Sequence, residues 1–375
     1  MGKICVVVGT RPEIIKVAPV ILEFRQRGFH DYVLINTGQH KDLSEPYWEL
    51  FDLKPDYNLS VMAQGSSLGI MTSRAFQQLD ELFNEIRASS PIDAILAQGD
   101  TTTVMVSSVL AFYRNLPFAH LEAGLRSFDL MNPFPEEFNR KVTSLVTQLH
   151  LAPTAKAKTN LLSEGVPENR ISVIGNTVVD ALKFVKNLPV FSDPSFSNRE
   201  LNSTFYNYER HVLITCHRRE NHGGNLLELI KAVSRLAKDQ QDTFFIWPVH
   251  PNPNVRSTVL SNKDLTSFKN VLLVDPLEYI DVIKVLSNCH MVISDSGGIQ
   301  EEAPSFRVPV LVFRNATERT EAIEAGLSKL VQANAEDIIH DYYNFKPEFG
   351  KDFENPFGDG LAAKRAVDLL FQLKM

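Results

Sequence analysis

The chain of 375 residues carries 45 acidic and 38 basic side chains, and 44% of its residues are hydrophobic, with a formal net charge of −7. This length exceeds the usual size of a single compact core, so we expect two globular domains. The acidic balance argues against a nucleic-acid-binding protein, because such proteins carry a surplus of Lys and Arg to neutralise phosphates. No apolar run approaches the length needed to span a bilayer, so we expect no membrane segment.

The N-terminal sequence and the cysteines indicate a cellular compartment. The chain enters a strand-like run at residue 4 without a charged and then apolar leader. Cys5, Cys216 and Cys289 are widely separated, which fits buried thiols in a reducing compartment better than disulfides or a zinc site. We therefore expect a cytoplasmic protein that has no metal centre.

Short apolar runs alternate with longer amphipathic segments along the whole chain. The runs predicted as strands are residues 4–8, 31–37, 93–98, 118–123 and 149–153 in the first half and 211–216, 243–249, 271–275, 289–294 and 308–313 in the second. Each is almost continuously apolar, which is typical of parallel strands that helices cover on both faces. The pattern predicts an α/β protein with two doubly wound, Rossmann-like domains.

The expected domains are residues 1–170, residues 171–358, and a C-terminal helix over residues 359–375 that packs back on the first domain. Residues 191–210 are rich in Ser, Asn and charge, so we interpret them as a loop or linker near the boundary. Ligands of open parallel sheets bind beyond the carboxyl ends of the strands, so the residues after each run are the candidates for function.

The segment after the first run, "GTRPEIIK", combines a turn, a helix start and two cations. Pro12 suits the first helical turn, where its missing N–H has no cost. Arg11 and Lys16 bring positive charge to this helix start and would suit an anionic ligand. The alternative is that both are solvated surface residues.

Carboxylates follow later runs of the first half. Asp100 follows "DAILAQ", Glu122 ends the strand-like part of "FAHLEAGLRS", and Glu136 and Glu137 lie in "NPFPEEFNRK". We expect Asp100, Glu122 and one of the glutamate pair to converge, because crowded carboxylates acquire the separate pKa values that acid and base roles require. Helix capping is the alternative for Asp100, and a surface position is the alternative for each carboxylate.

The second half offers a cationic loop after its first strand. His217 stands at the end of "HVLITC" and is followed by two arginines, whose planar donors suit phosphate oxygens. The alternative for His217 is a structural histidine.

A second loop in this half, "SDSGGIQEEAPS", places glycines where a strand turns into a helix. Ser296, Gly297 and Gly298 would present backbone N–H groups to a phosphate at the helix N-terminus. Glu301 and Glu302 lie one turn further on, where they could accept hydrogen bonds from a ribose diol or favour the helix dipole. Neither a dinucleotide fingerprint nor a Walker loop is present, so the sequence gives no support for hydride chemistry on NAD.

Ten stretches in order resemble one family over about residues 4 to 320. They are "GTRPEIIK", "TGQH", "GDTTT", "HLEAGLRS", "PEEFNR", "GNTVVDAL", "HRREN", "PVHPNPNVR", "SDSGGIQEEAPS" and "TER", and they are similar to those of the non-hydrolysing UDP-N-acetylglucosamine 2-epimerases. The resemblance implies an isomerase with a glycosyltransferase-B-type fold, UDP on the C-terminal lobe, the sugar in the cleft between the lobes, and a homodimer. It implies reversible conversion of UDP-N-acetylglucosamine (UDP-GlcNAc) to UDP-N-acetylmannosamine (UDP-ManNAc) for surface polysaccharide, through UDP elimination to 2-acetamidoglucal and without a cofactor.

The same resemblance implies roles for individual residues. Asp100, Glu122 and Glu136 match the acid and base carboxylates, and His217 matches a histidine of the cleft. The positions that match substrate contacts are Arg11, Lys16, Ser296, Gly297, Gly298, Glu302 on the ribose, and Arg319. Gln39 and Arg74 match positions that contact a second UDP-GlcNAc, which acts as an activator in bacterial members.

Three alternatives stay open at this level. Two are enzymes, namely an epimerase of a related UDP-diacetamido-uronic acid and a hydrolysing 2-epimerase, although hydrolysing relatives typically begin "GSRAEY" where this chain has "GTRPE". The third is a two-lobed solute-binding module, for which a cluster of three carboxylates would be costly beside an anionic ligand.

Overall fold

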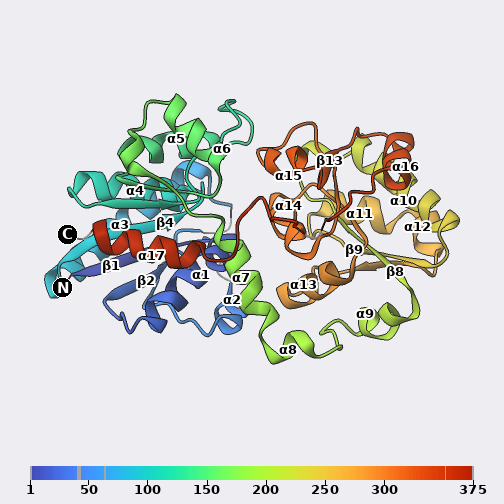
Figure 1. The fold of residues 1–375 in the computed structure, drawn as a ribbon, viewed down its shortest axis with the longest axis horizontal. Helices are drawn as coiled ribbons and strands as arrows, with labels where there is room; N and C mark the ends of the chain where they lie inside the picture. Colours follow the sequence, from blue (N-terminus) through green and yellow to red (C-terminus); the bar gives the residue numbers. More distant parts are fainter. Residues whose placement is uncertain (1, 40–43, 63–64, 351, 374–375) are drawn as a thin grey trace. The chain divides into compact units, whose positions relative to one another are not determined.

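The computed structural model describes residues 2–39, 44–62, 65–350 and 352–373, which form two compact units (Figure 1). The first unit comprises residues 1–184 and 357–375, and the second comprises residues 185–356. Each unit is a parallel sheet with helices on its faces, so the chain has the doubly wound α/β architecture that the alternation of runs predicts.

The first unit contains a seven-stranded sheet of order β3-β2-β1-β4-β5-β6-β7, and every pairing in it is parallel. Its strands are β1 (Lys3–Val8), β2 (Tyr32–Asn36), β3 (Tyr57–Asn58), β4 (Ile92–Gln98), β5 (Phe118–Leu121), β6 (Leu149–Ala152) and β7 (Ile171–Val173). Its helices are α1 (Arg11–Gln26), α2 (Glu45–Leu50), α3 (Leu68–Ser89), α4 (Thr102–Tyr113), α5 (Glu136–Val146), α6 (Ala155–Ser163), η2 (Glu168–Arg170), α7 (Thr177–Lys186) and α17 (Ala362–Leu373).

The second unit contains a six-stranded sheet of order β10-β9-β8-β11-β12-β13, again parallel throughout. Its strands are β8 (Arg210–Thr215), β9 (Thr243–Pro248), β10 (Val271–Val274), β11 (Met291–Ser294), β12 (Val310–Val312) and β13 (Ser328–Leu330). Its helices are α8 (Pro189–Ser192), α9 (Arg199–Thr204), η3 (Phe205–Asn207), η4 (Arg219–Asn221), α10 (Gly224–Asp239), α11 (Pro253–Leu260), α12 (Lys263–Ser267), α13 (Tyr279–Asn288), α14 (Gly297–Glu302), η5 (Ala303–Phe306), α15 (Thr320–Glu324) and α16 (Ala335–Asn344).

All ten predicted strands are confirmed, and three short edge strands, β3, β7 and β13, escaped prediction. The central strands are apolar on both faces because helices cover both, and Ile4 to Val8 are fully buried. The missed strands have two or three residues and expose part of each, so they lack a continuous apolar run.

The boundary between the units lies further along the chain than the sequence suggested. Residues 171–184 were expected in the second domain, but β7 pairs with β6 and therefore extends the first sheet. The segment 191–210, interpreted as a linker, belongs to the second unit and contains α9, which Asn198 caps by accepting a hydrogen bond from the Leu201 amide. Local helix caps, which composition does not register, order this polar segment.

The C-terminal helix α17 lies along α1 in the first unit (Figure 1). Phe371 stacks on Phe24 with ring centroids 6.1 Å apart, and Arg27 forms an ion pair with Asp368 at 2.5 Å. The carboxylate of Asp180 in α7 accepts hydrogen bonds from the first amides of α17. The end of the chain thus completes the first unit rather than the second.

The three cysteines are buried and free, as their spacing predicted, and burial raises the pKa of the Cys5 thiol to about 12. In the described part of the chain, no helix has both the length and the apolar character that crossing a membrane requires.

Candidate functional site

In the first sheet the strand order reverses between β1 and β4, and a crevice that binds ligands is expected at the carboxyl ends of such strands. Arg11 and Lys16 follow β1, Asp100 follows β4, and Glu122 follows β5. Gln98 of β4 is in register with Leu121 of β5, so Asp100 and Glu122 emerge from the same edge of neighbouring strands.

Lys16 and Glu122 form a buried ion pair at this edge. The Lys16 Nζ atom lies 2.5 Å from Glu122 Oε2, and the two residues are 7% and 8% exposed. Gln98 donates a second hydrogen bond to the same oxygen. The surface alternative is therefore wrong for Lys16 and Glu122, and Gln98 is a partner that sequence reasoning missed because it is the last residue of an apolar strand.

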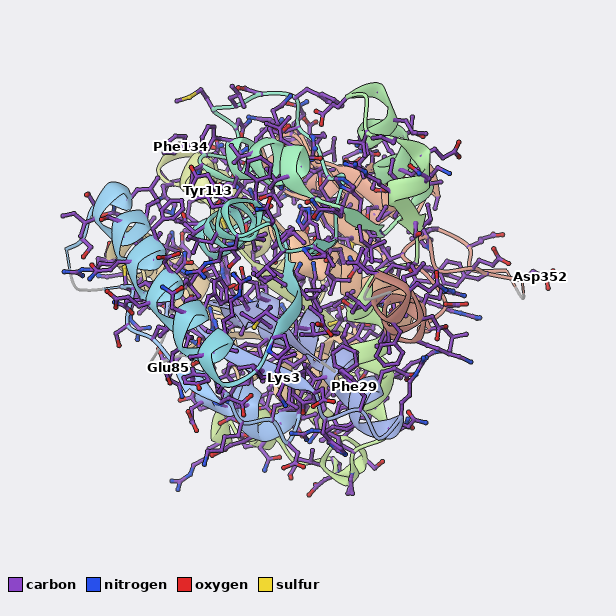
Figure 2. The ribbon with its side chains drawn as sticks, turned by 90° about the vertical axis from the view of Figure 1, so that its left-hand side faces the viewer. Lys3, Phe29, Glu85, Tyr113, Phe134 and Asp352 are labelled. Carbon is purple, nitrogen blue, oxygen red and sulfur yellow. The ribbon has the colours of Figure 1, made fainter. Side chains whose placement is uncertain are left out.

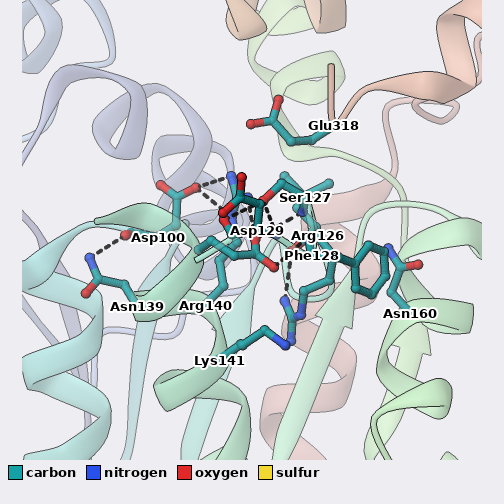
Figure 3. A network of polar contacts seen from close by, with 12 residues as sticks. Asp100, Arg126, Ser127, Phe128, Asp129, Asn139, Arg140, Lys141, Asn160 and Glu318 are labelled. Carbon is teal, nitrogen blue, oxygen red and sulfur yellow. Dashed lines mark hydrogen bonds and ion pairs between the residues drawn. The ribbon is translucent and has the colours of Figure 1, made fainter. Parts of the chain in front are cut away.

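Asp100 is held by α5 (Figure 3). Arg140 donates to its Oδ2 atom from Nε and Nη2 at 2.9 and 2.7 Å, and Asn139 donates to its backbone carbonyl at 2.9 Å. The N-cap of α4 is Thr101, the residue that follows Asp100. Arg140 and Asn139 lie in the "PEEFNR" stretch, where the prediction singled out only the glutamates.

The two glutamates of that stretch have different environments. Glu137 is fully buried, forms an ion pair with Arg140 at 3.0 Å and accepts hydrogen bonds from the amides of Ser127 and Phe128. Its carboxylate therefore organises the loop before α5. Glu136, the first residue of α5, is half-buried, and within the pair it is the better candidate for chemistry.

Two buried groups that sequence reasoning did not select hold the turns of this site. Glu13 accepts hydrogen bonds from the amides of Gly9 and Thr10 and from the Thr101 hydroxyl. His120 of β5 is hydrogen-bonded through Nε2 to the Gly99 carbonyl at 2.7 Å, and burial lowers its pKa to about 4, so a neutral ring donates this bond at neutral pH. For Glu13 the available signal was the Thr-x-x-Glu spacing of a capping box.

The remaining candidates of the first unit follow β1 and β2 or lie on α3. Arg11 is half-buried at the first position of α1. Gln39 accepts a hydrogen bond from the Thr103 hydroxyl at 3.2 Å, and Arg74 on α3 donates to Ser66 at 3.3 Å. Among the described residues no contact joins Gln39 to Arg74, and His40 of the "TGQH" stretch lies outside them.

The second sheet reverses its order between β8 and β11, and Asp295 bridges the two strand ends there. It is fully buried, lies 2.9 Å from Nδ1 of His217, and accepts hydrogen bonds from the amides of His217 and Arg218 and from the Asn221 side chain. Burial alone would raise the pKa of Asp295, but the bond and charge of His217 and the other donors outweigh it and bring the pKa to about 2. A carboxylate on Nδ1 leaves Nε2 of a neutral His217 as a proton acceptor.

The glycine loop follows β11. Ser296 is the N-cap of α14, Gly297 is its first residue and Gly298 is exposed. A Cβ atom at position 297 would come within 2.9 Å of the Arg319 guanidinium, whereas a Cβ at position 298 would meet only the Ser296 hydroxyl, at 3.8 Å. The fold therefore has space for a side chain at position 298.

The glutamates of α14 have separate partners. Glu301 accepts a hydrogen bond from Nε of Arg319 at 2.8 Å. Glu301 therefore forms an ion pair across the loop, and we no longer consider it a candidate for the ribose. Arg319 also lies 3.3 Å from Glu318. Glu302, 6% exposed, accepts a hydrogen bond from the Tyr279 hydroxyl at 3.0 Å, a partner that the sequence did not indicate.

No group of three or more His, Cys, Asp or Glu side chains within the described ranges is arranged to hold a metal ion.

The buried pair of Lys16 and Glu122 can be tested by a double-mutant cycle. Lys16→Met leaves a buried carboxylate without its cation and should lower the free energy of unfolding by about 3 kcal/mol or more. Adding Glu122→Gln removes the charge, so the double variant should recover most of that loss. Urea denaturation of the four proteins measures both effects, and independent, additive losses would contradict the coupling.

Comparison with known proteins places the chain in a family. A sequence model described as UDP-N-acetylglucosamine 2-epimerase matches residues 22–371. The UDP-N-acetylglucosamine 2-epimerase of Neisseria meningitidis is 39% identical over 99% of both chains, and that of Escherichia coli K12 is 38% identical over 98% of both.

Solved structures agree over the same length. The Neisseria meningitidis enzyme bound to UDP-GlcNAc has a TM-score of 0.88 at 38% identity and covers 99% of this chain and 100% of its own. The Methanocaldococcus jannaschii enzyme in complex with UDP-GlcNAc and UDP has a TM-score of 0.83 at 32% identity and covers 99% of each chain. With its two doubly wound units of the glycosyltransferase-B type, the chain belongs to the UDP-N-acetylglucosamine 2-epimerase family.

Proposed function

We propose that this protein interconverts UDP-GlcNAc and UDP-ManNAc by inverting C2 of the sugar without hydrolysis. The observation that carries this proposal is the edge of the first sheet, where Asp100 and Glu122 follow neighbouring strands and each is held by a buried cation, Arg140 and Lys16 respectively. Membership of the 2-epimerase family supports the substrate, since two structural relatives contain bound UDP-GlcNAc.

The chemistry we propose is elimination followed by re-addition. A carboxylate removes the proton from C2 while the C1–O bond breaks, a C1–C2 double bond forms, and UDP leaves with the bonding electrons. UDP then adds back to C1 of the 2-acetamidoglucal, and C2 receives a proton on the opposite face. Asp100, Glu122 and Glu136 supply the acid and base roles, and no electron carrier is needed because no net oxidation occurs.

The second unit is proposed to bind the nucleotide. The start of α14 offers the N–H groups of a helical first turn, which have no partner within the helix, to the diphosphate. Arg319, packed over Gly297 and paired with Glu301 and Glu318, provides guanidinium N–H groups beside that turn, and His217 is oriented by Asp295 to accept or deliver a proton. Glu302 remains our candidate for the ribose hydroxyls.

One experiment distinguishes this proposal from its alternatives. Proton NMR of the purified protein with UDP-GlcNAc in D2O should show UDP-ManNAc as the new sugar nucleotide, with deuterium entering at C2. Free N-acetylmannosamine and UDP would instead indicate a hydrolysing epimerase. Turnover only of a UDP-diacetamido-uronic acid would identify the related epimerase, and binding without turnover of either would indicate a solute-binding module.

The carboxylates should affect turnover without affecting the nucleotide. Asp100→Asn or Glu122→Gln should lower kcat by about 10²-fold or more, because each removes a proton-transfer group. UDP affinity, measured by calorimetry, should stay within about twofold, since the groups proposed to hold UDP lie in the other unit. A parallel loss of UDP affinity would show that these residues are structural rather than catalytic.

The glycine loop makes a separate prediction. Gly298→Val fits the space that the fold leaves at this position, so the thermal melting temperature should change little. If a diphosphate approaches this turn, the added side chain should weaken UDP binding at least tenfold, equivalent to about 1.4 kcal/mol. Calorimetric titration of a folded Gly298→Val protein that binds UDP normally would remove the loop from the site.

We propose that the protein is a homodimer formed through the first unit. Apolar side chains are exposed on α4 and α5 and before α5, and Tyr113 and Phe134 lie on the face shown in Figure 2. Phe134 and Phe138 line a hollow of about 640 Å³, to which α3 and α4 contribute Leu68, Phe76 and Met105. Patches of this kind mark protein interfaces, and most soluble oligomers are symmetric dimers.

Light scattering tests the dimer with a matched pair of variants. The wild-type protein should have the mass of two chains. Leu145→Asp, at an 83% exposed position of α5, should shift the measured mass toward that of a single chain. Leu227→Asp, at a 46% exposed leucine of α10 in the second unit, is the control and should leave the mass unchanged. A single-chain mass for the wild-type protein would contradict the proposal.

The setting of the reaction is part of the same proposal. Three buried free cysteines suit the reducing cytoplasm, and UDP-ManNAc would serve as a precursor of surface polysaccharide. Cell fractionation tests the cytoplasmic location, and the polysaccharide content of a strain lacking this protein tests the role of UDP-ManNAc as a precursor.

The activator role of UDP-GlcNAc, with Gln39 and Arg74 in contact with it, stays a prediction. Initial rates at varied substrate concentration would test it.

A further inference from the structure

Glu13 is a buried carboxylate at the edge of the first sheet to which the proposed reaction assigns no part. It lies in the first turn of α1 and is 2% exposed. Its Oε2 atom accepts hydrogen bonds from the amides of Gly9 and Thr10 at 2.5 and 2.8 Å. Its Oε1 atom accepts one from the Thr101 hydroxyl at 2.5 Å. Each oxygen of this carboxylate therefore serves a different turn.

These two turns follow β1 and β4, the strands between which the sheet reverses its order. The first turn leads into Arg11, and the second contains Asp100 directly before Thr101. A crevice at such a reversal is where ligands of open α/β sheets bind, so the spacing of these turns sets the geometry of the site. Glu13 is a direct side-chain link between them.

The packing around the first turn leaves little freedom for another arrangement. A Cβ atom at Gly9 would lie 2.4 Å from the Thr37 hydroxyl and 2.5 Å from the Thr103 hydroxyl, so only glycine fits there. Thr37 and Thr103 are themselves hydrogen-bonded at 2.9 Å. The Gly9 Cα therefore packs against Thr37 and Thr103 while the Gly9 amide donates to Glu13.

The charge of Glu13 is coupled to the site. Burial raises the pKa of Glu13 to about 7 against the lowering effect of its three hydrogen bonds, and the negative charge of Asp100 raises it further. Asp100 faces Glu13 from the turn after β4 and is itself paired with Arg140 of α5. Lys16, one turn further along α1, is paired with Glu122 from the end of β5.

We propose that Glu13 is a positioning residue of the epimerisation, whose carboxylate holds the Arg11 turn and the Asp100 turn at the spacing that the reaction needs. The inference rests on the proposed function and adds to it a group that touches neither the sugar nor the nucleotide. Glu13 therefore acts on the reaction through the geometry of the two turns.

The test uses the full-length protein with UDP-GlcNAc as substrate and four variants. Glu13→Ala should lower kcat at least ~10-fold, because misplacement of reacting groups by about 1 Å can cost 10²-fold, while calorimetric UDP affinity should be unchanged. Glu23→Ala is the matched control: this glutamate lies on the same helix, where it pairs with Arg27 at 2.6 Å, and its loss should leave kcat unchanged.

Glu13→Gln separates geometry from charge. Its amide can accept from the Gly9 and Thr10 N–H groups and donate to Thr101, so kcat should recover most of the loss seen with alanine. Thr101→Val breaks the link from the other side, so the double variant Glu13→Ala/Thr101→Val should be no slower than Glu13→Ala alone.

The outcomes are distinct. If Glu13→Ala has a kcat within about twofold of Glu23→Ala, or if Glu13→Gln is as slow as Glu13→Ala, the inference is wrong. If Glu13→Ala does not fold, the kcat of Thr101→Val decides it, because a loss of ~10-fold at unchanged UDP affinity supports the inference and an unchanged kcat overturns it. A wild-type protein without 2-epimerase activity would overturn the proposed function itself, and with it this inference, whereas an active wild type with unaffected variants would overturn the inference alone.

Discussion

Each sheet of this protein has one fully or almost fully buried carboxylate that bridges the two strand ends between which the strand order reverses. In the first unit Glu13 joins the turns after β1 and β4, and in the second Asp295 joins the turns after β8 and β11. Such a carboxylate is needed because the backbone N–H groups of the turns, where the chain leaves a parallel sheet, must find hydrogen-bond acceptors. A short acidic side chain supplies several acceptors at one point and so fixes both turns at once.

The two bridges differ in electrostatics. Asp295 accepts bonds from a histidine, an asparagine and two amides, and these donors outweigh burial, so its carboxylate stays ionised with a pKa of about 2. Glu13 has three donors, but burial and the nearby Asp100 dominate, and its pKa rises to about 7. The second unit therefore has a permanent anion beside His217, whereas the first has a carboxylate that titrates near neutral pH.

Other buried charges at the carboxyl ends of the two sheets are paired with residues of opposite charge. Lys16 and Glu122 neutralise each other, Arg140 is shared between Asp100 and Glu137, and Arg319 is shared between Glu301 and Glu318. Burying an isolated charge is expensive, and pairing offsets that cost only when the geometry is fixed by further hydrogen bonds. Gln98 provides such a bond to the Glu122 carboxylate, and Asn139 fixes Asp100 through its backbone carbonyl.

The sequence by itself determined the alternation of apolar runs, because strands that are buried on both faces are continuously apolar. From these runs follow ten strands, two doubly wound units and the positions of Asp100, Glu122 and His217 at strand ends. It did not determine which of Glu136 and Glu137 serves the fold, that Glu301 belongs to Arg319, or that β7 extends the first sheet. Those outcomes depend on contacts between residues far apart in the chain. Thr101, for example, meets Glu13 across 88 positions, and Asp295 meets His217 across 78. Only the tertiary structure decides such partners, because a carboxylate has the same local pattern whether it caps a turn, pairs with a cation or faces a substrate.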